Sequence, residues 1–330
     1  MQADQERRSR LLSLKLRALV RDHLALDTDP QGTAHVFAPG AAFVTDDAAW
    51  FLIDGDASRS LGPVLAWSMV NGVTGTVNIL TEDNGGVVAR RAALFPRDIR
   101  VWKVDDRTIT TEEPVAHDPS VLPSPDHMSF AELIEAAGAE ITIEHGVVAG
   151  EVRGLEMCRV VDDENEGSPR LEVGMGAHDR EAFAMVHGHL PTSDALRQVM
   201  DAVLPHRLPG ASPHPLNQFG AERLMRWNAM QDPSSVGCAS LAPAEPPVKR
   251  TNLKDTVPCV AVGIDADGAT VAATFVFGAD LDAVPFALDA ADRLGTGRAV
   301  LVMRARDITR STENLVSLAG ASLSLVRLPA

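Results

Sequence analysis

The sequence predicts an α/β protein in which two duplicated ββαβαβ units with mixed sheets flank a central α+β segment. Residues 41–104 and 260–328 repeat the same order of β-rich runs, a helix with proline near its start, and a closing glycine, while the residues between them follow another pattern. We interpret the repeat as an internal duplication. The predicted segments are an N-terminal helix and lead-in (1–38), the first unit (39–105), a linker (106–128), the central segment (129–204), a proline-rich connection with one helix (205–258) and the second unit (259–330).

The first copy opens with two β-rich runs around a polar turn at residues 45–47. A helix follows with Pro63 near its start. Proline suits the first helical turn because its missing N–H would have no partner there. The helix ends at Gly72, a residue type that readily takes the left-handed cap conformation. A short apolar strand, a second helix and a final strand complete the unit.

The second copy has the same signals in the same order. Its hairpin turn contains Asp267-Gly268, and Asp-Gly is a strong hairpin signal. Its first helix has Pro285 near the start and Gly295 at the end. Because strand–helix–strand crossovers are right-handed, each copy should form a mixed sheet with helices packed on it.

The central segment and the connection after it predict shorter elements. Ser129 is expected to cap a helix over 129–138, with Glu132 three residues further on. The other predicted elements are strands at 140–145, 147–161 and 170–175 and helices at 179–188 and 192–204. Residues 205–258 hold nine of the 21 prolines, which predicts a long connection with one helix at 217–230.

Charge and composition restrict the function. The formal net charge is −15, and an acidic surface repels phosphate backbones, so extensive nucleic-acid binding is not expected. No apolar run reaches the roughly 20 residues that a membrane helix needs, and the N-terminus lacks an apolar signal core. Three widely spaced cysteines indicate reduced thiols in a cytoplasmic protein. The basic stretch 7–21 predicts a helix docked on the body, with contact to an anionic lipid or nucleic acid as the alternative.

Residues 41–56 run through two β-rich strands to an Asp-Gly-Asp triplet at 54–56, and a helix follows. This ββαβ order resembles the core of the PD-(D/E)XK, or restriction-endonuclease-like, superfamily, in which an Asp on the first hairpin strand and a Glu-x-Lys on the second bind a divalent metal. Here the triplet 54–56 stands where Glu-x-Lys would be, Ala41 or Ala42 stands in place of the first Asp, and residues 277–279 (Phe-Gly-Ala) have the matching place in the second copy. The resemblance implies a scaffold that has lost nuclease chemistry.

The central segment offers two carboxylates for a metal. Glu151 lies on one predicted strand and Glu172 near the end of the next, so the two could hold Mg²⁺ or Mn²⁺ together with water. His178 or His187 would then be the general base. Glu156 is an odd number of residues from Glu151 and would point to the opposite face of one regular strand. The alternative is that these carboxylates are simply exposed on a two-sided strand.

Two further patterns in this segment resemble binding sites. Residues 171–176 run from a strand into Gly-x-Gly, but Asp179 takes the third glycine position of a dinucleotide loop and would repel a pyrophosphate. We expect Asp179 to cap a helix instead. His187 and His189 form a His-x-His pair that can ligate a metal, yet no third ligand has zinc-site spacing.

Residues 212–228 include most of the predicted helix at 217–230 and could bind an anion. Arg223 and Arg226 are three residues apart and therefore share a helical face. Together with His214 and Asn217 they could meet an anionic ligand. The alternative is a docked helix with surface arginines and a buried tryptophan.

The sequence leaves three functions open. Duplication without a complete catalytic set favours a non-catalytic, nuclease-like scaffold that binds a nucleotide, a nucleic-acid end or a protein partner. No cofactor is predicted for it, and self-association is a further possibility. One alternative is a divalent-metal-dependent hydrolase with its site in the central segment, and the other is a structural or assembly protein.

Overall fold

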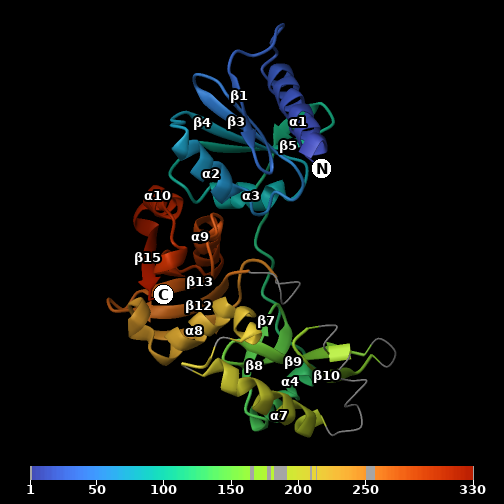
Figure 1. The fold of residues 1–330 in the computed structure, drawn as a ribbon, viewed down its shortest axis with the longest axis vertical. Helices are drawn as coiled ribbons and strands as arrows, with labels where there is room; N and C mark the ends of the chain where they lie inside the picture. Colours follow the sequence, from blue (N-terminus) through green and yellow to red (C-terminus); the bar gives the residue numbers. More distant parts are fainter. Residues whose placement is uncertain are drawn as a thin grey trace. The chain divides into compact units, whose positions relative to one another are not determined.

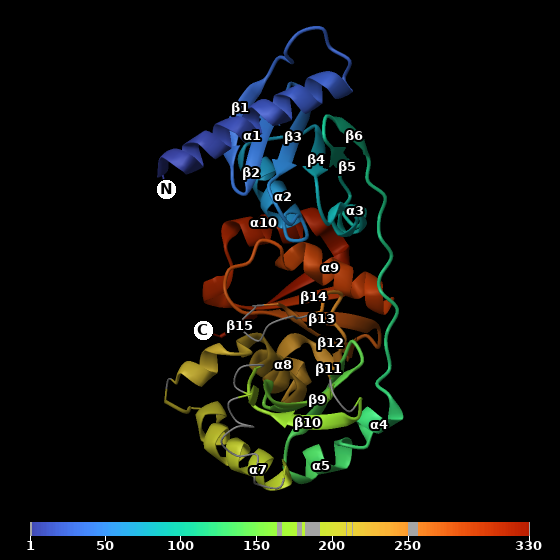
Figure 2. The same ribbon diagram turned by 90° about the vertical axis from the view of Figure 1, so that its right-hand side faces the viewer.

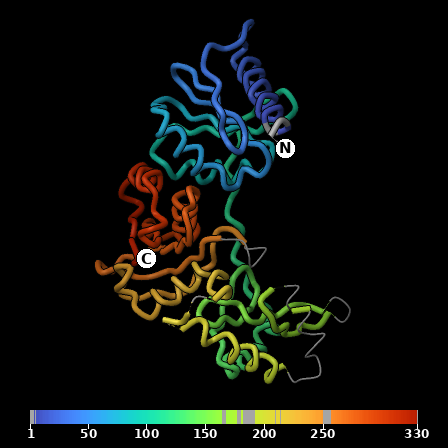
Figure 3. Tube along the Cα trace, in the orientation of Figure 1, coloured from blue at the N-terminus to red at the C-terminus, as the bar shows by residue number. Residues whose placement is uncertain are grey.

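A computed structural model gives the fold, and the coloured parts of the trace in Figure 3 are the residues that it describes. They are residues 2–163, 167–176, 180–181, 192–208, 210–212, 214–249 and 257–329. The chain forms two compact units. Unit 1 consists of Met1–His117, Ala279–Asp292 and Ile308–Ser324, and unit 2 of Asp118–Gly278, Arg293–Asp307 and Leu325–Ala330.

Unit 1 contains a six-stranded sheet in the order β1-β2-β3-β4-β5-β6, whose strands are all labelled in Figure 2. The strands are β1 (Thr33–Phe37), β2 (Gly40–Val44), β3 (Ala48–Ile53), β4 (Thr76–Thr81), β5 (Ile99–Asp105) and β6 (Thr108–Thr111). Strands β3, β4 and β5 are parallel, and the pairs β1–β2, β2–β3 and β5–β6 are antiparallel. The sheet is therefore mixed, as the sequence predicts.

Helices cover both faces of this sheet (Figures 1 and 2). Along β3, Trp50 packs with Leu16 of α1 (Gln2–His23), whereas its neighbour Phe51 meets the ring of Trp67 in α2 at 5.4 Å between centroids. Because successive strand residues point to opposite faces, α1 covers one face and α2 (Leu61–Val70) the other, together with α3 (Gly85–Ala92). The predicted docking of the N-terminal helix is confirmed.

Unit 1 also holds α10 (Arg310–Ala319) and most of α9 (Ala283–Leu294). Gly62 of α2 lies so close to the segment before α9 that a Cβ there would sit 2.0 Å from the carbonyl oxygen of Leu281. Glycine is therefore required at this position because the backbones approach each other directly.

Unit 2 begins with an antiparallel sheet in the order β10-β9-β8-β7. Its strands are β7 (Glu140–Glu144), β8 (Val147–Val152), β9 (Leu155–Asp162) and β10 (Pro169–Val173). Helices α4 (Pro125–Met128) and α5 (Ala131–Ala136) precede the sheet, and α7 (Thr192–Val203) follows it. A core that includes Met157 of β9 and Leu196 of α7 fills one side of this sheet.

A five-stranded sheet follows in the order β11-β12-β13-β14-β15. Its strands are β11 (Cys238–Ala244), β12 (Cys259–Asp265), β13 (Thr270–Val276), β14 (Ala299–Arg304) and β15 (Leu323–Leu328). The apolar side of α8 (Ala221–Gln231) packs on it, because Met225 and Ala229 share a core with Cys259 and Phe275. One side of α8 is therefore buried against this sheet.

The predicted α/β class is confirmed, and both terminal segments show the predicted element order. It is β2-β3-α2-β4-α3-β5 in the first and β12-β13-α9-β14-α10-β15 in the second, and in each the first two strands are antiparallel and the next pair parallel. Their common origin stays a prediction. β1, β6 and β11 lie in segments for which no strand was predicted; β11 carries Pro243, which an edge strand tolerates. Among the described residues, no helix is both long and apolar enough to cross a membrane.

Candidate functional site

The β8–β9 hairpin brings two buried glutamates together. The predicted strand 147–161 is in fact two strands, joined by Arg153 and Gly154 with φ of 47° and 79°. Such left-handed pairs form the tight turns that suit the twist of a hairpin. Glu151 and Glu156 are therefore cross-strand partners on one face, and the expectation that they point to opposite faces was wrong because it assumed one continuous strand.

Helix α8 supplies arginines to these carboxylates. Arg223 donates to both Glu151 and Glu144, and Arg226 lies 3.3 Å from Glu144 Oε1 and 3.5 Å from Glu151 Oε2. Arg226 also donates to the carbonyl oxygen of Val260 at 3.1 Å. The structure thus joins two predicted sites in one cluster: the metal-ligand candidate Glu151 pairs with the anion-site candidates Arg223 and Arg226.

Burial and charge fix the ionisation of Arg223 and of Cys259 in this cluster. Glu151 and Arg223 are each only 4 % exposed. Burial opposes the charge of Arg223, but Glu151 and Glu144 outweigh it and raise the pKa of the guanidinium well above its usual value. The neighbouring thiol of Cys259 is fully buried, which raises its pKa to about 12 and keeps it protonated. Arg223 is therefore always charged, and Glu144 and Glu151 are its partners.

Glu172, the second metal-ligand candidate, also binds arginines. It accepts from Arg170 at 2.7 Å and from Arg180 at 3.0 Å. Burial opposes its charge, but these hydrogen bonds outweigh it and lower the pKa of Glu172. Glu172 does not face Glu151 across a hairpin, since β9 lies between β8 and β10. Glu156 on β9 pairs with Arg159 at 2.8 Å and with Arg180 at 3.4 Å.

A small cavity of about 30 Å³ lies beside the Glu151 cluster. Its lining residues are Thr142, Glu144, His145, Val147, Ala149, Glu151, Glu156, Arg159, Arg223 and Lys249. The lining contains three carboxylates and three cations of lysine or arginine, so its formal charges balance with a neutral histidine. The cavity has room for an ordered water, and the balanced charge gives a divalent cation no net attraction.

The remaining candidates of the central segment take other roles or lie elsewhere. The ring of His214 stacks on that of His206 at 3.9 Å, and its Nδ1 accepts from the backbone N–H of Leu216. Asn217 lies in the same short 3₁₀ turn, Pro215–Gln218, with its Oδ1 buried. His178 and His187, the candidate general bases, lie outside the described residues, as do Asp179 and His189.

Both aspartates of the Asp-Gly-Asp triplet after β3 bind side chains of unit 1. Asp54 pairs with Arg8 of α1 at 2.6 Å. Asp56 accepts from Ser58 and from the side chain of Asn84 at 2.8 Å, and these bonds outweigh burial and lower its pKa. Hence both carboxylates at the positions that match the nuclease motif have partners within the chain.

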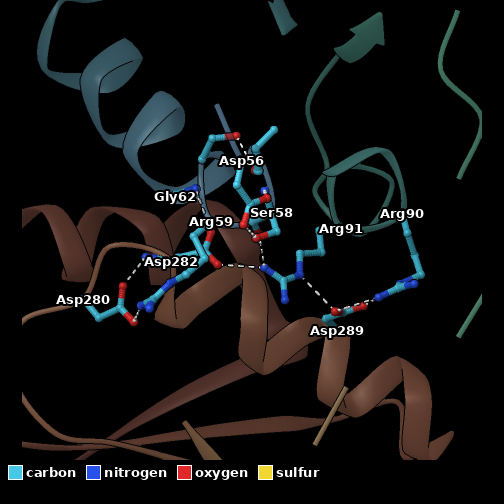
Figure 4. A network of polar contacts seen from close by, with 11 residues as sticks. Asp56, Ser58, Arg59, Gly62, Arg90, Arg91, Asp280, Asp282 and Asp289 are labelled. Atoms are coloured by element: carbon cyan, nitrogen blue, oxygen red, sulfur yellow. Dashed lines mark hydrogen bonds and ion pairs between the residues drawn. The ribbon is translucent and has the colours of Figure 1, made fainter. Parts of the chain in front are cut away.

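A second buried charge cluster lies in unit 1 and was not predicted (Figure 4). Arg91 of α3 donates to Asp282 at 2.7 Å and to Asp289 at 2.9 Å, and Arg90 donates to Asp289 at 2.8 and 3.1 Å. Burial raises the pKa of Asp282 to about 6 in spite of Arg91. Burial also acts against the charge of Asp289, but the two arginines outweigh it and lower its pKa.

Arg207 is a third structural arginine that sequence reasoning missed. It donates to the carbonyl oxygens of Arg153, Leu216, Phe219 and Gly220, and burial lowers its pKa to about 10. A usable signal existed for Arg91, which is three residues after the buried Val88 and therefore shares its helix face. No comparable pattern marks Arg207, which lies in a 3₁₀ turn.

Comparison of the chain with protein-family models, with curated proteins and with solved structures finds no match.

Proposed function

We propose that this chain is a non-catalytic binding protein whose ligand is another protein. The observation that supports the proposal is the mutual pairing of Glu151 with Arg223 and Arg226 in unit 2. The acidic residues that a metal site would use and the basic residues that an anion site would use are committed to each other. The same holds for Glu172 with Arg180 and for Asp54 with Arg8.

Metal catalysis would require these carboxylates to exchange partners. Mg²⁺ and Mn²⁺ bind through carboxylate oxygens that are free to coordinate. In this chain Arg223 already donates to Glu151, and Arg180 already donates to Glu172. Arg223 is also buried. Breaking a buried ion pair leaves an uncompensated charge, which costs roughly 3–5 kcal/mol. The pairing therefore disfavours the hydrolase alternative.

A nucleotide or a nucleic-acid end is a less suitable ligand than a protein. Phosphates are bound by accessible guanidinium and ammonium groups, whereas Arg223 and Arg226 are buried and neutralised. The net charge of −15 adds long-range repulsion of polyanions. Binding to another protein needs neither accessible arginine or lysine side chains nor a positively charged surface. A protein is therefore the ligand that best suits the non-catalytic scaffold.

The test compares catalysis and ligand binding in the same preparation. We expect the full chain to show no divalent-dependent cleavage of DNA or RNA and no rise in melting temperature with Mg²⁺ or Mn²⁺, although a ligand at 100 times its Kd would add about 2.7 kcal/mol of stability. Labelled nucleotides and DNA ends should likewise not bind. Divalent-dependent cleavage that is lost in Glu151→Gln and Glu172→Gln, but kept in the exposed control Glu135→Gln, would overturn the proposal in favour of the hydrolase.

A further inference from the structure

Large apolar side chains are exposed on α1 and β1 of unit 1. Leu11 and Leu14 of α1 are 57 % and 54 % exposed, and Val36 of β1 is 81 % exposed. Single exposed apolar residues are ordinary, but a group of them on neighbouring elements marks an interaction surface. Of these three residues, Leu14 and Val36 face the same groove.

A groove of about 950 Å³ separates the first half of α1 from β1 and the turn after it. Leu14 and Val36 both line it. Its other lining residues are Glu6, Arg8, Ser9, Arg10, Leu12, Ser13, Ala34, His35, Phe37, Ala38, Pro39, Gly40 and Asp54. The exposed leucine and valine thus belong to one continuous surface.

β1 is the edge strand of the six-stranded sheet, and β2 is its one neighbour among the described strands. The backbone groups on its outer side are therefore open to pairing with another strand. Natural edge strands are usually protected by charged residues, proline or a bulge. Residues Thr33–Phe37 contain no charged residue and no proline, and their register with β2 has no shift. This edge lacks the features that discourage association.

The side chains of β1 are complementary to a second copy of β1. Ala34 and Val36 are paired with Phe43 and Ala41 of β2, which share a core with α1, and therefore point to the α1 side. His35 and Phe37 contact Trp67 on the other side. In an antiparallel pair of β1 strands centred on His35, Val36 of each copy lies opposite the partner's Ala34. The larger valine then packs against the smaller alanine, and the twofold axis repeats this contact on the other side of the pair.

The charges at the rim of the groove fit the same arrangement. Glu6 and Arg10 both line the groove. Neither has an ion-pair partner within the part of the chain that the structure describes, in contrast to Arg8, which pairs with Asp54. In an isologous contact each copy presents the same surface, so Glu6 of one copy can pair with the partner's Arg10 and the reverse. These two ion pairs across the interface would offset part of the repulsion between two acidic chains.

We propose that two copies of this chain associate through β1, which joins their sheets edge to edge and buries Leu14 and Val36. The occupant of the groove surface is a second copy, paired antiparallel about His35. This inference does not depend on the function proposed above, since a self-associating chain can have any ligand.

The test is the mass of the full chain in solution, measured by light scattering and sedimentation equilibrium. We expect twice the 35.1 kDa of one chain. Val36→Lys should weaken the dimer by roughly a hundredfold or more, because an unpaired charge is costly in a buried interface. The matched control is Val70→Lys, which changes a valine of similar exposure (73 %) at the end of α2 and should leave the dimer intact. A monomeric wild type, or equal effects of the two substitutions, would overturn the proposal.

A second measurement tests the register and remains valid if Val36→Lys folds poorly. The three native cysteines are buried, so a cysteine introduced by His35→Cys is the accessible thiol of the variant. Directly opposed residues of an antiparallel pair have Cα atoms about 4.5–5.5 Å apart, within the range that a disulfide spans. Oxidation should give a covalent dimer with His35→Cys and none with Val70→Cys. Failure of His35→Cys to cross-link would contradict the proposed pairing.

Discussion

Replacement of Glu151 by glutamine tests whether the cluster on β8 and α8 is structural. Glu151→Gln keeps the size of the side chain and removes its charge. Arg223 and Arg226 then lose one of the two carboxylates that neutralise them, and both guanidinium groups stay buried. The variant therefore leaves positive charge uncompensated in the interior of unit 2.

The magnitude follows from the contacts. Removing one partner of a buried ion pair typically costs about 3–5 kcal/mol. Glu144 remains beside both Arg223 and Arg226 after the substitution. Since part of the compensation is kept, we expect a loss near the lower end of that range, about 3 kcal/mol in the free energy of unfolding.

Equilibrium urea unfolding followed by circular dichroism measures the loss, and hydrogen exchange of β8, β9 and α8 localises it to unit 2. The control is Glu135→Gln, which neutralises an exposed glutamate of α5 in the same unit. The control should stay within about 0.5 kcal/mol of the wild type. If Glu151→Gln also stays within that limit, the cluster does not stabilise the fold, and its carboxylate is available for another role.

Three further substitutions, one of them with a control at Gly72, test the packing of both units. Asp282→Asn should flatten the pH dependence of stability, because burial raises the pKa of Asp282 in the folded state from 3.8 to about 6. The protonated carboxyl therefore adds on the order of 3 kcal/mol to the free energy of unfolding below about pH 4, and this contribution is lost as the pH rises through about 6. Parallel melting-temperature profiles of wild type and variant between these pH values would contradict this. Gly62→Ala should cost more than about 2 kcal/mol, because its Cβ would meet the backbone of Leu281. Gly72→Ala, which meets nothing within 4 Å, should cost only about 1 kcal/mol of left-handed strain; equal losses by thermal melting would argue against the close contact. Arg207→Met should cost about 2–4 kcal/mol, since four backbone carbonyls lose their donor, and wild-type stability in urea would show that water replaces it.

The order of elements was predictable because its signals are local. Pro63 and Gly72 mark the region of α2, and Pro285 and Gly295 that of α9. Each signal acts through the backbone of its own turn, so no knowledge of tertiary contacts is needed. The hairpin at Arg153 was missed because Arg-Gly is not among the common turn pairs and apolar residues continue on both sides of it.

The candidate site was predictable only as two separate halves. Residue type and spacing selected Glu151 on one side and Arg223 with Arg226 on the other. Glu151 and Arg223 are 72 positions apart in sequence, and no local pattern states that one will neutralise the other. The same is true of Arg91 and Asp289, 198 positions apart. Long-range charge pairing depends on how the sheets and helices pack, which the sequence pattern does not contain.

NMR tests most directly whether arginines keep metal away from Glu151 and Glu172. The side-chain carboxyl signals of both residues are followed during addition of Mn²⁺, a paramagnetic ion that broadens the signals of groups close to it. Because arginines already bind both carboxylates, we expect their signals to broaden no more than that of the exposed Glu135. Selective broadening of Glu151 and Glu172 together at low Mn²⁺ concentration would show that the two carboxylates share a metal, which contradicts the account.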